Sequence, residues 1–362
     1  MIFHPLKLSF QQAFNPKNNS LGFIRLFLAI LVVLQHSYHL GGFGNEPLTS
    51  LNAQLNSGTL AVHSFFIISG FLITSSYLKL ANIWQYLWHR VLRIFPAFWV
   101  CLIIISLFFA PLTYFATYRS LAIPINSSIS YILQNFLLII NQPDIENLLS
   151  SHIEQSFNGS LWTLQWEFIL YIFIGVLGLF SLFTKKYKYL VVAIFIIFFI
   201  TNYIIDPCHC TILLKYYTHP RIPPLFCLFL AGSLFCLYQD KIPHDKRFFV
   251  LSLLLSIIAL KFNFYFWLET FTLPYIILCL SIYLPWKNFD TKYGDYSYGI
   301  YIYHFPILQL LIAYKLEKLG VLIYSLIGLL LTLPFAYASW NLIEKPSLKF
   351  KNINFKLPIY FK

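Results

Sequence analysis

Long apolar runs, separated by short polar stretches, repeat along the whole chain. A helix needs about 20 apolar residues to cross the roughly 30 Å hydrocarbon core of a bilayer, and runs near that length recur throughout. The pattern predicts an all-α fold, a polytopic transmembrane helical bundle of about ten spans. The expected spans are residues 22–40, 58–79, 91–110, 161–183, 189–205, 222–238, 248–264, 267–285, 296–314 and 320–341.

One apolar stretch, Ile129 to Ile140, is too short to cross a bilayer. We expect it to form an interfacial or re-entrant piece of the long loop over residues 111–160. The N-terminal stretch has no short apolar core followed by a small-residue cleavage site, so we expect no cleaved signal peptide. The regions predicted are a cytoplasmic N-terminal segment over 1–21, a transmembrane domain over 22–345 and a cytoplasmic C-terminal tail over 346–362.

The lysine and arginine residues set the expected orientation. If the N-terminus lies inside, most of the 25 basic residues fall in segments that face the cytoplasm, as the positive-inside rule requires. Both termini are then cytoplasmic and the number of spans is even. No internal repeat of fixed period is visible, which gives no support to a transporter built from repeated halves.

Composition agrees with a membrane protein. The chain is 59% hydrophobic and only 10% charged, against about 25% charged residues in soluble domains. Its net charge of +12 could suggest a nucleic-acid partner, but the basic residues flank apolar runs instead of forming a stripe, so we exclude nucleic acid. Cys208 and Cys210 form a Cys-His-Cys loop, which supplies too few ligands for a metal site. We predict no metal.

Four polar side chains fall at membrane depth. His36 follows Arg25 by eleven residues, which is roughly 16 Å along a helix, so it lies near the bilayer centre if Arg25 marks a boundary. His63, Glu167 and His304 lie roughly 8, 10 and 12 Å from the nearer surface of the membrane. Such groups are costly in lipid, so we expect the four to converge on one interior cavity.

A second cluster is basic and lies on the expected cytoplasmic side. Arg90 and Arg93 are three residues apart and share a helix face, and Arg25 opens the first span on the same side. Guanidinium groups bind phosphate in a bidentate manner. The cluster suggests a phosphate-bearing molecule that arrives from the cytoplasm, although the arginines could also serve only as topology anchors.

Six stretches, taken together and in order, resemble the integral-membrane acyltransferase family 3, which includes O-antigen and other polysaccharide O-acetyltransferases. They span residues 25 to 346, nearly the whole chain. They are Arg25 with His36; Ser64 to Ile73; Arg90, Arg93 and Pro96; Ser160 to Glu167; Tyr296 to Pro306; and Glu344 to Pro346.

This resemblance implies an acyl-CoA donor, usually acetyl-CoA, as co-substrate without a resident cofactor. It implies a carbohydrate acceptor, possibly lipid-linked, such as lipopolysaccharide O-antigen, and a place in the bacterial inner membrane among membrane lipids. In family terms His36 is the essential histidine, Arg25 its companion, and Arg90 and Arg93 the donor-binding arginines. One departure is His63, where many members carry Asp. Some relatives also carry a C-terminal periplasmic esterase-like domain; we expect none here, so a second transfer step would need another protein.

The expected chemistry is acyl transfer from a thioester to a hydroxyl. A neutral histidine suits removal of the hydroxyl proton, because its pKa lies near working pH. We predict that His36 is this base, with Glu167 and His304 as further catalytic candidates. Each has a plainer role, Glu167 as a capping acid and His304 as support for a kinked helix. His63 and Tyr301 are possible acceptor-side residues. A covalent acyl-histidine and direct transfer both stay open.

Two smaller expectations concern packing. Ser69 and Gly70 are interpreted as a small-residue contact between helices, and not as a nucleophile. Glu344 and Lys345 are interpreted as a structural ion pair.

The competing hypothesis is a proton-coupled transporter or flippase of a lipid-linked sugar, in which the membrane histidines relay protons. Binding of coenzyme A would discriminate an acyltransferase from this alternative.

Overall fold

The computed structural model describes residues 8–52, 54–80, 82–120, 125–201 and 222–352. Within this part the fold is all-α, as predicted, and its one β contact is an isolated antiparallel bridge between Ser9 and Pro243. The loop with Cys208 and Cys210 lies outside the described residues.

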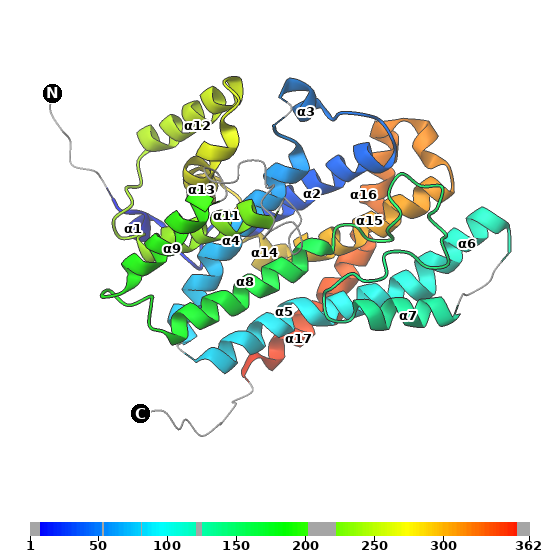
Figure 1. The fold of residues 1–362 in the computed structure, drawn as a ribbon, viewed down its shortest axis with the longest axis horizontal. Helices are drawn as coiled ribbons and strands as arrows, with labels where there is room; N and C mark the ends of the chain where they lie inside the picture. The colour runs from blue at the N-terminus through cyan, green and yellow to red at the C-terminus, as the bar shows by residue number, and fades with distance from the viewer. Residues whose placement is uncertain (1–7, 53, 81, 121–124, 202–221, 353–362) are drawn as a thin grey trace.

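Helices of very different length make up the fold (Figure 1). The longer ones are α2 (Leu21–Leu40), α4 (Ser57–Leu80), α5 (Ile83–Ile104), α8 (Trp162–Leu179), α9 (Lys188–Ile200), α11 (Ile222–Leu237), α12 (Lys246–Lys261), α13 (Tyr265–Tyr283), α15 (Ser297–Ala313) and α16 (Val321–Ala338). The shorter ones are α1 (Phe10–Ala13), α3 (Pro47–Leu51), α6 (Ala110–Tyr118), α7 (Ile125–Asn135), α14 (Phe289–Tyr293) and α17 (Lys345–Ser347). Short π and 3₁₀ segments complete the set: η1 (Ile105–Phe109), η3 (Leu316–Leu319), η4 (Ser339–Glu344) and η5 (Leu348–Asn352).

In the described part of the chain, each of the ten expected spans overlaps one of the longer helices. In the described part of the chain, six helical stretches are long and apolar enough to cross a membrane, and three shorter apolar helices accompany them. The six are Leu21–Leu40, Ser57–Leu80, Ile83–Tyr118, Trp162–Leu179, Tyr265–Tyr283 and Val321–Asn352. The chain is therefore a membrane protein. The count of ten spans and the cytoplasmic termini stay predictions.

Helix α4 lies at the centre of the bundle and packs against α2 and α11 (Figure 1). Gly70 of α4 permits the contact with α11, because a Cβ at this position would clash with the carbonyl oxygen of Phe229. The expected small-residue contact is thus present. Helix α15 packs in turn against α2 and α16.

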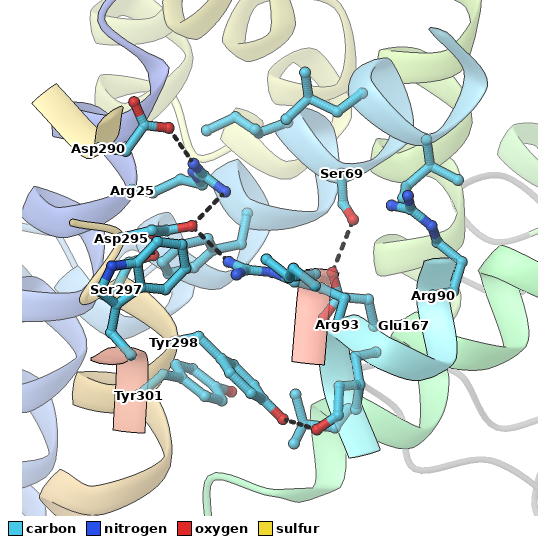
Figure 2. A pocket seen from close by; sticks show the side chains of 18 of the residues that line it. Arg25, Ser69, Arg90, Arg93, Glu167, Asp290, Asp295, Ser297, Tyr298 and Tyr301 are labelled. Carbon is cyan, nitrogen blue, oxygen red and sulfur yellow. Dashed lines mark hydrogen bonds and ion pairs between the residues drawn. The ribbon is translucent and has the colours of Figure 1, made fainter. Parts of the chain in front are cut away.

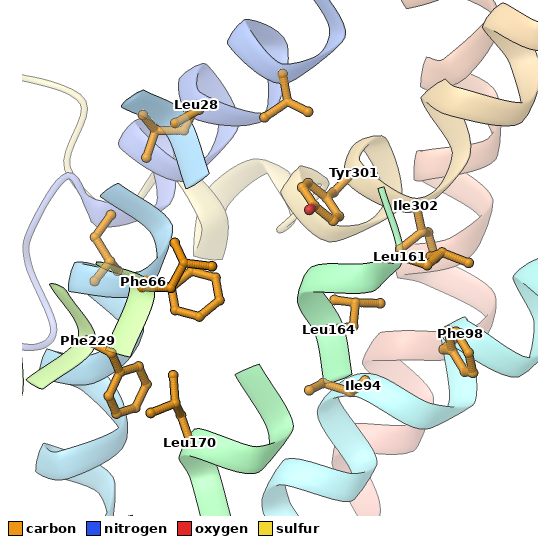
Figure 3. Close-up of a cluster of buried hydrophobic side chains, with 14 of the residues drawn as sticks. Leu28, Phe66, Ile94, Phe98, Leu161, Leu164, Leu170, Phe229, Tyr301 and Ile302 are labelled. Atoms are coloured by element: carbon orange, nitrogen blue, oxygen red, sulfur yellow. The ribbon is translucent and has the colours of Figure 1, made fainter. Parts of the chain in front are cut away.

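The main core fills the space between these helices (Figure 3). It brings together Leu28 of α2, Phe66 of α4, Phe98 of α5 and Leu164 of α8, all of them buried. Tyr301 and Ile302 of α15 belong to the same cluster. The core therefore fixes α2, α4, α5, α8 and α15 against one another, and these helices carry the polar residues singled out above.

The stretch from Ile129 to Ile140 does not form a span. It overlaps α7 and the turn that follows, and α7 packs against α5 and η1. The ring of Phe136 stacks on Trp99 at 4.7 Å between centroids. An irregular segment then runs back to α8, and its buried polar residues reach α15.

Candidate active site

A cavity of about 630 Å³ opens between α4, α8 and the N-terminal parts of α2, α5 and α15, with further residues from α14 and η4 in its wall (Figure 2). We call it the arginine cavity, because Arg25, Arg90 and Arg93 all line it. Its wall holds six basic side chains and three acidic ones. The basic ones are Arg25, Arg90, Arg93, Lys292, Lys345 and Lys351; the acidic ones are Glu167, Asp290 and Asp295. This excess of positive charge favours an anionic ligand.

Two of the three arginines are held by carboxylates. Arg25 contacts Asp290 at 3.0 Å and Asp295 at 3.3 Å. Arg93 contacts the same oxygen of Asp295 at 2.6 Å and also reaches Glu344 at 3.3 Å. Figure 2 shows Arg25, Asp295 and Arg93 joined in a row. This chain of ion pairs links α2, α5 and η4 through the segment that precedes α15, so it fixes the cavity end of the bundle.

Asp295 is the centre of this chain. It lies just outside α15 and is 7% exposed. Burial by itself would raise the pKa of Asp295, but Arg25, Arg93 and the Ser297 hydroxyl, which donates to Asp295 at 2.7 Å, hold that pKa below its usual range. Asp295 therefore stays ionised. Glu344 pairs with Arg93, and not with its neighbour Lys345 as expected, and Lys345 lines the cavity instead.

Arg90 differs from the other two arginines. Among the described residues no carboxylate lies within 4 Å of it; its guanidinium lies 5.8 Å from the rings of Tyr86 and Tyr171 and donates a 3.4 Å hydrogen bond to Ser76. Its Nε is buried without a hydrogen-bond partner in the same part of the chain. In Figure 2 it lies across the cavity from Arg25. Arg90 is thus the cavity arginine best able to pair with a ligand anion.

His36 and His304 form a close pair further along α2 and α15. The Nδ1 of His36 lies 2.8 Å from the Nε2 of His304, and the rings stack with centroids 5.0 Å apart. This contact places the two histidines at the same level of the bundle, where α2 and α15 pack against each other. His304 is fully buried, whereas His36 is partly exposed.

The hydrogen bonds of His304 determine how protons are placed on the pair. Its Nδ1 lies 3.0 Å from the carbonyl oxygen of Ile300, which can only accept, so Nδ1 carries the proton. In a neutral His304 the Nε2 is then an acceptor, and His36 must donate to it from Nδ1. Neutral His36 therefore has its basic lone pair on Nε2, which is the form that a general base requires.

Tyr301 lies between the arginine cavity and the histidine pair. It lines the cavity, and its ring lies 6.2 Å from that of His304. Its hydroxyl contacts the Thr163 hydroxyl at 2.5 Å and donates to the carbonyl oxygen of Ser160 at 3.0 Å. The cavity and the histidines are thus separated by about one aromatic ring. Tyr301, expected on the acceptor side, lies on the wall that the arginines share.

Glu167 also lies in the arginine cavity and not beside His36. It accepts hydrogen bonds from Ser69 at 2.8 Å and from Tyr171 at 2.5 Å. The group next to His36 is His304. Ser69 thus holds a carboxylate across α4 and α8, a role that sequence reasoning did not foresee.

His63 is buried elsewhere. Its Nδ1 lies 3.0 Å from a carboxylate oxygen of Glu269 on α13, and Glu269 is fully buried. Neither residue lines the arginine cavity. The four polar residues expected to meet at one point therefore separate into the His36–His304 pair, Glu167 at the arginine cavity, and His63 with Glu269. The reason is that Glu167 and His63 each find a partner on a neighbouring helix, Ser69 of α4 for Glu167 and Glu269 of α13 for His63.

Sequence reasoning did not select Asp290, Asp295 or Glu269. A usable indication was the small number of acids in the chain, 13 in all, because an acid within or beside an apolar span needs a cationic partner. It also missed Asn158, which lies just before the matched stretch that begins at Ser160 and is buried against α15.

Comparison with known proteins adds independent information. The model of the acyltransferase domain of acyltransferase family 3 matches residues 18–341. An O-acetyl transferase of Shigella phage Sf6 is 27% identical, over 91% of this chain and 96% of that protein. Nodulation protein 10 of Rhizobium leguminosarum bv. viciae is 26% identical, over 92% of this chain and 94% of that protein. No solved structure matches.

Proposed function

This chain belongs to acyltransferase family 3, and we propose that it is a membrane O-acetyltransferase that uses cytoplasmic acetyl-CoA. The acceptor in this proposal is a hydroxyl of a cell-surface glycan or of its lipid-linked precursor. The name of the phage relative supports acetyl transfer to oxygen. Lipopolysaccharide O-antigen is the acceptor we would test first, in a bacterial inner membrane.

The observation that carries the proposal is the position of the His36–His304 pair directly behind a basic cavity. Tyr301 lines the cavity, and its ring lies 6.2 Å from that of His304. A transferase needs an anion site for the donor and a base near the transferred group, in adjoining places. A transporter needs neither a phosphate site nor a base next to it, so the arrangement favours transfer.

In this proposal Arg90 binds a phosphate group of coenzyme A, since its guanidinium has no carboxylate partner among the described residues. Lys345 and Lys351 supply further positive charge on the same wall. Arg25 and Arg93 maintain the shape of the cavity through Asp295. The expectation that Arg90 and Arg93 act as equal phosphate ligands is thereby refined into two different roles.

The transfer step conserves protons. His36 Nε2 removes the proton from the acceptor hydroxyl as its oxygen attacks the thioester carbonyl carbon. The carbon–sulfur bond breaks, and the proton passes from His36 to the sulfur that leaves as coenzyme A. His304 accepts the Nδ1–H bond of His36 throughout and so stabilises the imidazolium that forms. No net proton is released, so the reaction requires no proton path across the membrane.

The test uses cells that lack acetylation of the surface polysaccharide and carry either this chain or an empty vector. Labelled acetyl should appear in surface polysaccharide only with the chain, and the purified protein should bind coenzyme A. Absence of coenzyme A binding would contradict the proposal and favour the transporter. Binding without label in polysaccharide would keep the transferase class and reject this acceptor.

A further inference from the structure

Helix α15 contains a proline close to His304, and the proline leaves one backbone carbonyl without its helical partner. Pro306 has no N–H, so it cannot donate to the carbonyl oxygen of Ile302 four residues earlier. That carbonyl lies inside the bundle, where an unsatisfied acceptor is costly. The helix nevertheless continues from Ser297 to Ala313.

The side chain of Asn158 replaces the missing donor. Its Nδ2 lies 2.7 Å from the Ile302 carbonyl oxygen, and the thiol of Cys101 approaches the same oxygen at 3.3 Å. The other end of the Asn158 amide is also used, because its Oδ1 accepts from the Ser160 hydroxyl at 2.6 Å. Asn158 is 1% exposed. Its amide is thus held at both ends and cannot turn away from α15.

The next two residues press on the same part of α15. A Cβ added to Gly159 would lie 2.7 Å from the ring of Phe305. That ring in turn contacts His36, with centroids 5.0 Å apart. Ser160 donates to the Tyr301 carbonyl at 3.3 Å. Contacts from residues 158–160 therefore surround the turn of α15 that carries His304.

We infer that residues 158–160 form a positioning element for the histidine pair, with Asn158 as the key residue. Asn158 touches neither histidine. It acts through the Ile302 carbonyl, which it holds in place on the turn between Ile300, the acceptor of the His304 Nδ1–H bond, and Pro306. This inference rests on the proposed function, in which the His36–His304 pair takes part in acetyl transfer.

The test uses the fact that Pro306 is the reason why the Ile302 carbonyl lacks a helical donor. In Asn158→Ala the Ile302 oxygen loses its amide donor and keeps only the weak Cys101 thiol at 3.3 Å, so we expect the turn to relax and the His36–His304 contact to be displaced. Misplacement by an ångström can cost about a hundredfold in rate, so we expect kcat to fall about 10- to 100-fold with an unchanged KM for acetyl-CoA. Pro306→Ala restores an N–H to the helix, so Asn158→Ala with Pro306→Ala should regain most of the lost kcat.

Asn135→Ala is the matched control. Asn135 is as deeply buried, donates to the Gln142 carbonyl at 2.8 Å and accepts from the Asn141 amide at 2.9 Å, but it belongs to α7. We expect its kcat to stay near wild type. An equal loss in Asn135→Ala, no loss in Asn158→Ala, or a loss that Pro306→Ala does not restore would each overturn the inference.

Two measurements cover the remaining cases. If Asn158→Ala accumulates poorly, Gly159→Ala provides the first measurement. It keeps every hydrogen bond of Asn158 yet pushes Phe305 toward His36, and an unchanged kcat in this folded variant would contradict the inference.

The second measurement is the ¹⁵N spectrum of histidine-labelled protein, which requires no activity. The signals of the pair should shift in Asn158→Ala and return in the double variant. If wild type transfers no acetyl, the proposed function fails, and unshifted signals would then separately reject the positioning role.

Discussion

Arg90 and Arg93 look equivalent in sequence, but the structure predicts different effects when they are substituted. Loss of Arg90 should weaken donor binding, whereas loss of Arg93 should destabilise the fold. A hydrogen bond to a charged group contributes about 1.5–3 kcal/mol, and each 1.4 kcal/mol is a factor of ten in affinity. If Arg90 binds a phosphate of coenzyme A, Arg90→Ala should weaken acetyl-CoA binding about 10- to 100-fold. Arg90→Lys keeps the charge but loses the planar fork, so it should lose about tenfold. Neither change breaks an ion pair among the described residues.

Arg93 provides the comparison. Its contacts with Asp295 at 2.6 Å and with Glu344 at 3.3 Å would leave two carboxylates unpaired in Arg93→Ala. Removing one partner of a buried pair costs several kcal/mol, about 3–5 in measured cases, and partial exposure of Arg93 reduces this figure. We therefore expect Arg93→Ala to lower the thermal stability of the purified protein more than it lowers the affinity for coenzyme A.

The assay is calorimetric titration of coenzyme A and of dephospho-coenzyme A into each purified variant, with thermal unfolding measured in the same detergent. If Arg90 binds the 3′-phosphate, the difference in affinity between the two ligands should disappear in Arg90→Ala. Wild-type affinity in a folded Arg90→Ala protein, together with weakened binding in an equally stable Arg93→Ala protein, would refute the assignment.

Three further predictions follow from the same geometry. His304→Ala removes the acceptor that keeps the proton on Nδ1 of His36, so kcat should fall about a hundredfold while coenzyme A still binds, as steady-state assay and titration will show. Because the pKa of Asp295 is lowered in the folded protein, its stabilisation is complete above the ordinary aspartate range and is lost as pH falls below about 4; thermal unfolding of wild type and Asp295→Asn should differ at pH 7 and converge in acid. Gly70→Val should prevent α4 from packing on the Phe229 backbone and abolish accumulation of folded protein, measured by size-exclusion chromatography in detergent.

The sequence was sufficient to locate the helices, because about 20 consecutive apolar residues have few alternatives in a bilayer. It also placed Arg25 and His36 correctly along one helix, since a rise of 1.5 Å per residue fixes their axial separation. Helix–helix pairing was harder to foresee. Rotation of each helix about its axis decides which polar groups meet, and almost uniformly apolar spans carry little information on that rotation.

His63 and Glu167 illustrate this limit. They lie on α4 and α8, two of the helices expected to span, but each faces a partner that the expected cluster did not include: Glu269 for His63, and Ser69 with Tyr171 for Glu167. Asn158 was missed for a different reason. Its role depends on a carbonyl that Pro306 leaves free about 150 residues later, and a single sequence does not reveal such a contact.

The central claim is that His36 is the base of an acetyl transfer, and it is tested most directly by comparing His36→Ala with His39→Ala. Both residues lie on α2, but His39 is more exposed and contacts Glu154 at 3.8 Å, away from the pair. Transfer of labelled acetyl from acetyl-CoA should vanish in His36→Ala and persist in His39→Ala, with both proteins binding coenzyme A. Transfer that survives in a folded His36→Ala protein would contradict the account.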